Sequence, residues 1–197
     1  MVSKLFDVEH QLVFYGAYHS HKVNVAIHMV FVPTILWTAF VMARTLPIPE
    51  VFPKIHYTLN QYMTFDFNWP FVVAFLYNTY YMILDPVAGL LYVPEMALSL
   101  LTATSFAYRQ DGVKNAAILH AVSWIMQFIG HGVAEKRAPA LLDNLLGALV
   151  LAPFFVHLEI LFKLGYAPGL QKNVNNGIGV EIAKFRRAEA EKKRKAA

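Results

Sequence analysis

The chain has 197 residues and a formal net charge of +4, with 57% hydrophobic and only 15% charged residues. Soluble domains carry about 25% charged residues, so a soluble fold could not hide this much apolar surface. The absence of cysteine excludes disulfides and thiolate ligands, and any bound metal must take nitrogen or oxygen ligands.

Five apolar segments follow a polar N-terminal stretch of 24 residues that lacks the features of a signal peptide. A membrane-spanning helix needs about 20 apolar residues. The predicted segments are Val25–Ala43, Trp69–Leu84, Val87–Tyr108, Asn115–Gly130 and Ala140–Leu164. Residues 44–68 are expected to form an interfacial connector, and Asp85-Pro86 a tight hairpin.

Five spans would place the two termini on opposite sides of a membrane, whereas the charges at both ends are typical of a cytosolic location. We therefore predict an all-α integral membrane helical bundle with four full spans plus one re-entrant or interfacial segment. That segment is expected to be one of the two 16-residue stretches, 69–84 and 115–130. Residues 1–170 are predicted to form a single membrane-embedded domain, and residues 171–197 a basic cytosolic tail.

The basic tail holds seven Lys or Arg against three Glu over residues 181–197. Such a segment can contact nucleic acid or anionic lipid. We interpret it as a positive-inside signal and expect membrane lipids, and no nucleic acid, as partners. The oligomeric state does not follow from the sequence.

Four histidines lie within or at the ends of the apolar segments, namely His28, His120, His131 and His157. An ionisable side chain at membrane depth costs several kcal/mol unless it is paired, hydrated or bound to a metal. In a chain without cysteine, such histidines indicate imidazole coordination of a transition metal.

The first histidine cluster surrounds the start of the first span. Asn24 is a predicted N-cap, which places His28 one turn inside the helix on the same face. His19 and His21 precede Asn24. On one continuous helix His19 and His28 would point to opposite sides, so joint ligation requires a loop before Asn24.

The second cluster contains His120 and His131, which share a helix face but lie about 16 Å apart along a straight axis. One ion with metal–nitrogen bonds near 2.1 Å cannot bridge that distance. Either Gly130 ends the helix and turns His131 back, or two metals bind, or one histidine has another role. Glu135 follows His131 by one turn and could bind metal or fix an imidazole tautomer.

Other polar residues in these segments allow two interpretations each. Lys136 and Arg137 could clamp a substrate carboxylate or could simply set the topology. Glu95 could face a polar cavity or mark the headgroup boundary. His157 and Glu159 imitate part of a facial triad, but no second histidine follows them.

These motifs, in order and at matching spacing, resemble the Mpo-type 2-hydroxy fatty acid dioxygenases, which are endoplasmic reticulum membrane proteins of phytosphingosine breakdown. The resemblance covers about residues 5–165. The strings that carry it are Phe14-Tyr15, Tyr18-His19-Ser20, Asn24, Ile27-His28, Val32-Pro33, His120, Trp124, Gln127-Phe128-Ile129-Gly130-His131, Glu135, Arg137-Ala138-Pro139-Ala140 and Leu151-Ala152-Pro153-Phe154.

The resemblance implies that residues 1–170 form the catalytic domain of a non-haem Fe(II) dioxygenase. Such an enzyme uses O2 to shorten a 2-hydroxy fatty acid by one carbon. The family's metal-binding histidines carry over onto His19, His28, His120 and His131. We expect Glu135 and Gln127 to orient ligands, and Lys136 or Arg137 to offset the substrate charge; these four residues make up the predicted catalytic set. The resemblance also implies the endoplasmic reticulum membrane, and Lys193 and Lys195 match a dilysine retrieval signal.

Two functions of other classes stay open on the sequence alone. One is a non-enzymatic membrane protein whose histidines bind structural zinc. The other is a small proton-coupled transporter that uses Glu95, Glu159 and the histidines as a relay, although we find no matched repeats of the kind that transporters carry.

Overall fold

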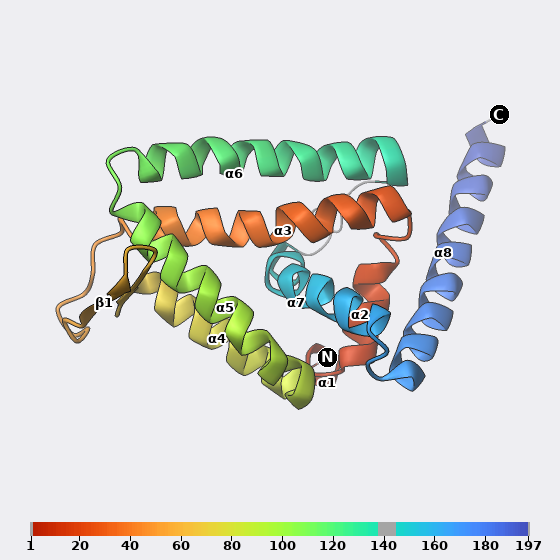
Figure 1. Ribbon diagram of the computed structural model, residues 1–197. Coiled ribbons are helices and arrows are strands. Elements are labelled where there is room, and N and C mark those ends of the chain that lie inside the picture. The colour runs from red at the N-terminus through yellow and green to blue at the C-terminus, as the bar shows by residue number, and fades with distance from the viewer. Residues whose placement is uncertain (1, 138–144, 197) are drawn as a thin grey trace.

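The computed structural model describes residues 2–137 and 145–196, and the regular secondary structure of these residues is helical apart from one short two-stranded hairpin (Figure 1). The elements are α1 (Val2–Leu5), α2 (Val8–Gly16), α3 (Lys22–Ala43), β1 (His56–Asn60), β2 (Met63–Asp66), α4 (Trp69–Leu84), α5 (Pro86–Ala107), α6 (Gly112–Ile129), the π-helix η1 (Gly130–Glu135), α7 (Leu145–Lys163) and α8 (Pro168–Ala196). The predicted all-α membrane bundle is confirmed.

Three helical stretches within the described ranges are long and apolar enough to cross a membrane, namely α3, α5 and the continuous run of α6 and η1. Helix α4 is apolar but shorter, and α7 with α8 qualifies only as a pair bent by 120°. The segment predicted at 115–130 is longer than expected because η1 extends it to Glu135. The start of the segment predicted at 140–164 lies outside the described residues.

Helices α3 and α6 run antiparallel and side by side along one side of the bundle (Figure 1). Helix α3 begins at Lys22 because the His21 side chain accepts a hydrogen bond from the Val23 backbone N–H at 3.2 Å. The prediction that Asn24 is the N-cap is therefore wrong. Asn24 lies in the first turn of α3 and is completely buried.

Helices α4 and α5 form the second antiparallel pair, and the predicted hairpin at Asp85-Pro86 is confirmed. The Asp85 carboxylate accepts hydrogen bonds from the backbone N–H groups of Val87 and Ala88 at 3.1 and 3.0 Å, and so caps α5. It also accepts one from the Tyr166 hydroxyl at 2.8 Å, which ties the loop after α7 to this turn.

The connector between α3 and α4 contains the antiparallel strands β1 and β2, with His56 paired to Asp66. The buried Asp66 carboxylate accepts hydrogen bonds from Arg44 at 3.3 Å, His56 at 2.7 Å and the Tyr108 hydroxyl at 2.8 Å. These four residues, which we call the hairpin cluster, fasten the strands to the ends of α3 and α5.

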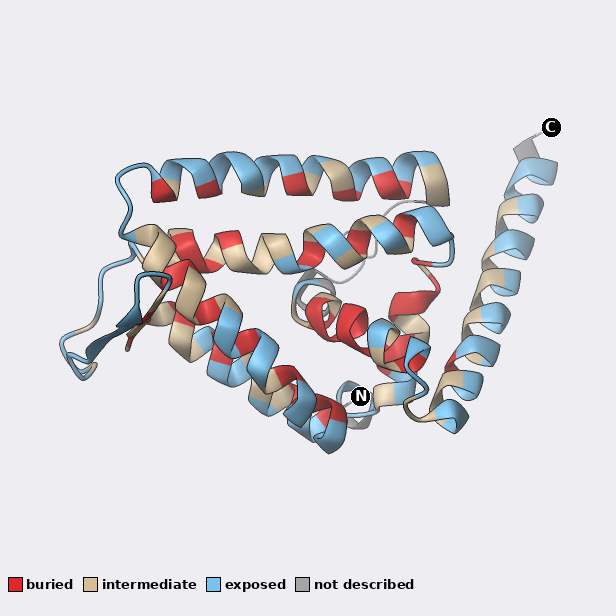
Figure 2. Cartoon of the chain, in the orientation of Figure 1, coloured by how far each residue is buried: buried red, intermediate tan, exposed pale blue. Residues whose placement is uncertain are grey.

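Burial follows the inner faces of the helices, while the outer faces stay exposed (Figure 2). Tyr81, Met96 and Leu158 are almost completely buried between α4, α5 and α7. The exposed outer faces carry large apolar residues such as Val30 and Phe75. An exposed apolar surface of this kind is typical of helices that face lipid.

Helix α7 lies inside the bundle, and α8 packs against α2 at the end where α3 begins (Figure 1). Val174 of α8 is buried, whereas the positions after Phe185 are mostly exposed. Within the described residues, the predicted tail is the continuation of a helix that starts at Pro168. Its separation at residue 171 as a unit of its own stays a prediction.

Candidate metal centre

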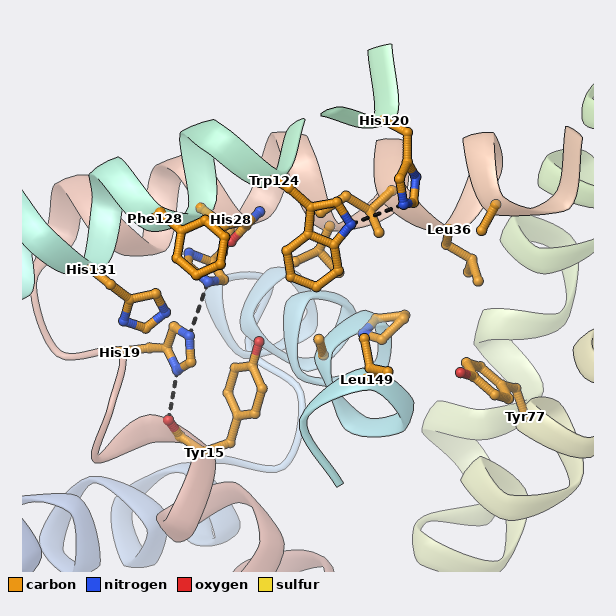
Figure 3. Close-up of a pocket in the computed structure, with 16 residues that line it drawn as sticks. Tyr15, His19, His28, Leu36, Tyr77, His120, Trp124, Phe128, His131 and Leu149 are labelled. Carbon is orange, nitrogen blue, oxygen red and sulfur yellow. Dashed lines mark hydrogen bonds between the residues drawn. The ribbon is translucent and has the colours of Figure 1, made fainter. Parts of the chain in front are cut away.

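Three buried histidines meet at the end of the bundle where α3 begins. His19 comes from the loop between α2 and α3, His28 from the second turn of α3, and His131 from η1. Each offers one ring nitrogen, and these nitrogens all lie within 4.8 Å of one another. We call this group the histidine triad (Figure 3). The three rings approach edge to face, with centroids 4.3 to 5.0 Å apart.

The position of His19 is set by the helix that precedes it. Its Nδ1–H donates to the Tyr15 carbonyl at 2.7 Å, and its ring stacks on the Tyr15 ring at 4.1 Å. Burial, and secondly the proximity of His28, lower the pKa of the His19 imidazole well below its usual 6.5. His19 is therefore held neutral, which is the state that a metal ligand needs. The loop that joint ligation requires is present at residues 17–21.

His28 is oriented in the same manner, because its Nδ1–H donates to the Asn24 carbonyl at 2.9 Å. In both His19 and His28 the remaining nitrogen, Nε2, carries a lone pair. These two Nε2 atoms lie 3.0 Å apart. Two lone pairs at this distance repel one another unless a cation lies between them. Two nitrogens at right angles around one ion, each ~2.1 Å from it, would also be about 3.0 Å apart.

His131 reaches the triad because α6 changes to a π-helix at Gly130. The wider turn rotates His131 relative to an uninterrupted α-helix, and π-turns are frequent at functional sites. Gly130 permits the close approach of α3, since a Cβ at this position would collide with the Asn24 side-chain oxygen. Among the described residues, His131 Nδ1 has no hydrogen-bond partner although it is buried. The triad thus contains a third unsatisfied nitrogen.

Glu135, at the end of η1, holds the loop that carries His19. Its carboxylate accepts hydrogen bonds from the Ser20 backbone N–H at 3.1 Å, the Ser20 hydroxyl at 2.5 Å and the His21 backbone N–H at 2.9 Å. The Asn24 amide adds a fourth at 3.2 Å. Glu135 therefore joins η1 to the start of α3 and positions the histidines from outside the triad.

A cavity of about 370 Å³ begins at the triad and extends between α3, α6 and α7 (Figure 3). Its walls are mainly apolar and include Val32, Leu36, Trp124 and Leu149. Pockets that are largely apolar with a few convergent polar groups are typical ligand sites. The triad supplies those polar groups at one end of this cavity.

His120 also lines the cavity but stands apart from the triad. The Thr38 hydroxyl donates to the Thr34 carbonyl at 2.8 Å, so it accepts the hydrogen bond from His120 Nδ1 at 2.8 Å. The Trp124 indole N–H donates to His120 Nε2 at 2.9 Å. Both ring nitrogens thus have partners, in contrast to His131. The metal role predicted for His120 stays a prediction, and the structure does not bring it to the other three.

His157 has partners at both nitrogens as well. Its Nδ1 contacts the Glu95 carboxylate at 2.8 Å, and its Nε2–H donates to the Ala88 carbonyl at 3.1 Å. This pair joins the buried His157 of α7 to Glu95 on the exposed side of α5. The contact between Glu95 and His157 was not predicted from the sequence, and neither residue belongs to the triad.

Gln127 precedes His131 by about one turn and lines the cavity. It is buried, and across the described ranges neither its amide oxygen nor its amide nitrogen has a hydrogen-bond partner. A buried amide without a partner costs about 1–3 kcal/mol. A polar ligand beside the triad would satisfy it.

Lys136 and Arg137 lie outside the cavity. Lys136 is exposed and adopts a left-handed conformation with φ of 53°. The Arg137 guanidinium donates to the Ala17 carbonyl at 2.7 Å and lies between the rings of Tyr18 and Phe185, 3.7 and 4.1 Å from their centroids. Arg137 therefore fastens both the His19 loop and α8 to the end of η1.

Residues 5–164 match the family model described as 2-hydroxy-palmitic acid dioxygenase Mpo1-like. The chain belongs to the Mpo1-like family. It is 37% identical over 183 residues to the 2-hydroxy-palmitic acid dioxygenase MPO1 of Saccharomyces cerevisiae, a match that covers 92% of this chain and 95% of the yeast protein. No solved structure matches the chain significantly.

The match confirms the family resemblance, and its range, residues 5–164, includes all three histidines of the triad. Sequence reasoning missed the roles of Tyr15, Ser20 and Asn24, which hold the histidines in place. The signal for Ser20 and Asn24 was their place as small polar residues beside His19 and His28. The contact of Tyr15 with His19 depends on the loop conformation and has no signature in the sequence.

Proposed function

We propose that this Mpo1-like protein is a non-haem Fe(II) dioxygenase that α-oxidises 2-hydroxy fatty acids to fatty acids one carbon shorter. The observation that carries the proposal is the convergence of two imidazole lone pairs 3.0 Å apart with a third unsatisfied imidazole, all at the polar end of an apolar cavity. The name of the yeast relative, a 2-hydroxy-palmitic acid dioxygenase, supports the same reaction and substrate class.

His19, His28 and His131 would hold one Fe(II) ion, because imidazole is a suitable ligand for iron. When bound, Fe(II) supplies the activation of O2 that a closed-shell organic substrate cannot provide. Three neutral ligands leave the site with a charge of +2, which favours an anionic substrate head. The triad histidines are buried and the cavity walls are mainly apolar, so the reacting end offers water few hydrogen-bond partners.

The substrate would place its carboxylate and 2-hydroxyl at the triad and its acyl chain in the cavity. Gln127 is suited to hold this head group, because its amide can both donate to a carboxylate and accept from a hydroxyl. Fixing the head in this way brings the C1–C2 bond to the reacting end and increases the rate by proximity. We assign Glu135 a positioning role through the His19 loop. Lys136 is exposed outside the cavity and Arg137 is bonded to the Ala17 carbonyl, so we assign neither of them a contact with the substrate carboxylate.

The reaction balances with O2 as the sole oxidant. R–CH(OH)–COOH and O2 give R–COOH, CO2 and water: the C1–C2 bond breaks, C2 becomes a carboxyl carbon and C1 leaves as CO2. O2 takes up the four electrons released, so no further reductant is required. The substrates would be the 2-hydroxy acids released in phytosphingosine breakdown.

We further infer a location in the endoplasmic reticulum membrane with both termini cytosolic. Helices α2 and α8 lie at the same end of the bundle, as this topology requires (Figure 1). Seven Lys and Arg residues follow position 181, in agreement with the positive-inside rule. Protease protection of tags at the two ends, in sealed microsomes, tests this placement.

The proposed activity is tested with detergent-purified protein, loaded anaerobically with Fe(II) and exposed to O2. With 2-hydroxyhexadecanoic acid we expect pentadecanoic acid as the product. Hexadecanoic acid, which lacks the hydroxyl, should not be consumed. Absence of pentadecanoic acid from the reaction with 2-hydroxyhexadecanoic acid, or an equal yield from His28→Ala protein, would contradict the proposal. Tight zinc without turnover would instead favour a structural metal site.

A further inference from the structure

The cavity extends from the triad to Tyr77 of α4, and the separation of these two groups defines a length. Two helices line it over the same distance. Ala39 lies eleven residues after His28 on α3, and His120 lies eleven residues before His131 on the antiparallel α6. At 1.5 Å per residue both stretches are about 16 Å long. In Figure 3 the triad lies at one end and Tyr77 at the other, with Trp124 and Leu149 between them.

We propose that this cavity measures the acyl chain, with Tyr77 and Ala39 as the residues that set the upper limit of chain length. The proposal rests on the proposed function for the identity of the head group. It assigns a substrate-length limit to two residues that lie far from the triad and that belong to none of the motifs of the sequence analysis.

The chemistry of the walls selects an alkyl chain as the occupant. Among the described residues that line the cavity beyond Gln127 and the triad, the side chains are apolar or aromatic except for His120. The two nitrogens of His120 are occupied by Thr38 and Trp124, so His120 presents no unsatisfied polar atom. These bonds also fix the Trp124 indole as part of the wall.

The length of the cavity fits a chain of about sixteen carbons. An extended alkyl chain advances about 1.25 Å per carbon, given a C–C bond of ~1.52 Å and an angle near 111°. With C1 and C2 at the triad, the fourteen carbons that remain take up about 17 Å, against about 16 Å of helix. The yeast relative is named for palmitic acid, which has a chain of this length.

The far end of the cavity is lined by Tyr77, which packs on the aromatic core of the bundle. The Tyr77 ring comes from α4 and packs against Tyr81, with centroids 5.9 Å apart. Tyr81 is completely buried, and its ring stacks on Phe154 of α7 at 4.5 Å. A longer chain would therefore have to displace a packed aromatic group, and inserting extra carbons into a packed core is unfavourable.

Two substitutions move this limit in opposite directions. Tyr77→Ala removes the stop and should shift the preferred chain to longer acids. Ala39→Phe should shorten it by about four carbons, because a phenyl ring is about 5 Å long and each carbon takes ~1.25 Å. The matched controls change the same kinds of group on the same helices at exposed positions, Phe75→Ala on α4 and Val30→Phe on α3.

The experiment measures two quantities for 2-hydroxy acids from ten to twenty-two carbons. The first is kcat/KM of the Fe(II)-loaded protein. The second is displacement of radiolabelled 2-hydroxyhexadecanoic acid from the metal-free protein. We expect both to peak near sixteen carbons, to shift in opposite directions for the two variants, and to stay unchanged in the controls. Because Ala39→Phe could impair folding, Tyr77→Ala alone is sufficient to decide.

The outcomes separate this proposal from the function on which it rests. If Tyr77→Ala folds and its length profile equals that of the wild type, the measuring role is overturned. If no acid is turned over but the binding profile still shifts in Tyr77→Ala, the dioxygenase assignment fails and the measuring cavity stands. A flat profile in the wild type, with turnover intact, overturns the measuring role alone.

Discussion

The two ends of the bundle are each organised by one carboxylate, and they use it differently. At the hairpin cluster, Asp66 binds the side chains of Arg44, His56 and Tyr108 directly. At the other end, Glu135 binds mainly the backbone and hydroxyl of the loop that carries His19. The first arrangement occupies its histidine, whereas the second positions histidines and leaves their nitrogens facing one another. The difference is that Asp66 occupies the ring of its histidine, whereas Glu135 holds the backbone that carries His19 and leaves the rings of the triad free of carboxylate contacts.

The largest expected effect is the difference in turnover between a substitution in the histidine triad and one in the hairpin cluster. His28→Ala should lower turnover by more than about 100-fold, because loss of a direct ligand exceeds the 10–100-fold effect typical of outer-shell residues. His56→Ala, in the hairpin cluster, should leave turnover near the wild-type value. Steady-state kinetics on Fe(II)-loaded protein measures both. Equal losses in the two variants would mean that the triad has no special role.

The second largest expected effect is a difference in metal affinity between substitutions of Glu135 and of Asp66. Glu135→Gln places an amide N–H against backbone donors and should weaken metal binding by about 10–100-fold. Asp66→Asn should leave the metal affinity unchanged, while lowering stability by about 2 kcal/mol through the loss of charge-assisted hydrogen bonds. Metal titration with a competing chelator and thermal unfolding in detergent measure the two quantities. A loss of metal affinity in Asp66→Asn would show that the ends are not independent.

The smallest effect concerns two arginines that each stack on a tyrosine, Arg137 on Tyr18 and Arg44 on Tyr108. A lysine at either position keeps the charge but loses the planar stacking and the fork of donors. Each substitution should cost about 1 kcal/mol, or about 2–4 °C in Tm for a chain of this size. Only Arg137→Lys should also reduce metal affinity, since Arg137 holds the His19 loop. The same change in Arg44→Lys would contradict this assignment.

Sequence reasoning located most of the helices but not the details that bring the site together. The segments at 25–43, 69–84 and 87–108 match α3, α4 and α5 closely because apolar length is encoded locally. The start of α3 was misplaced because an imidazole at His21 replaces the expected Asn24 cap. The hairpin at residues 56–66 was not expected within the connector.

In the candidate site, too, the residues were predicted from the sequence but the geometry that brings them together was not. His19, His28 and His131 were among the predicted ligands, and the sequence left open how His131 could turn back. The π-helix at Gly130–Glu135 turns it back, but the change from i→i+4 to i→i+5 hydrogen bonds has no clear signature in the sequence. The bonds of His120 to Thr38 and Trp124 depend on the packing of α3 against α6. The spacing of residues along α6 alone therefore could not show whether His120 is a metal ligand or a hydrogen-bonded residue of the helix packing.

The most direct test of the central claim is the number of Fe(II) ions bound per chain, measured by anaerobic titration and metal analysis. Wild-type protein and His120→Phe should each bind one ion. His19→Ala, His28→Ala and His131→Ala should each fall well below one under the same conditions. Retention of iron in the three triad variants, or its loss in His120→Phe alone, would contradict the account and return the metal to a different set of histidines.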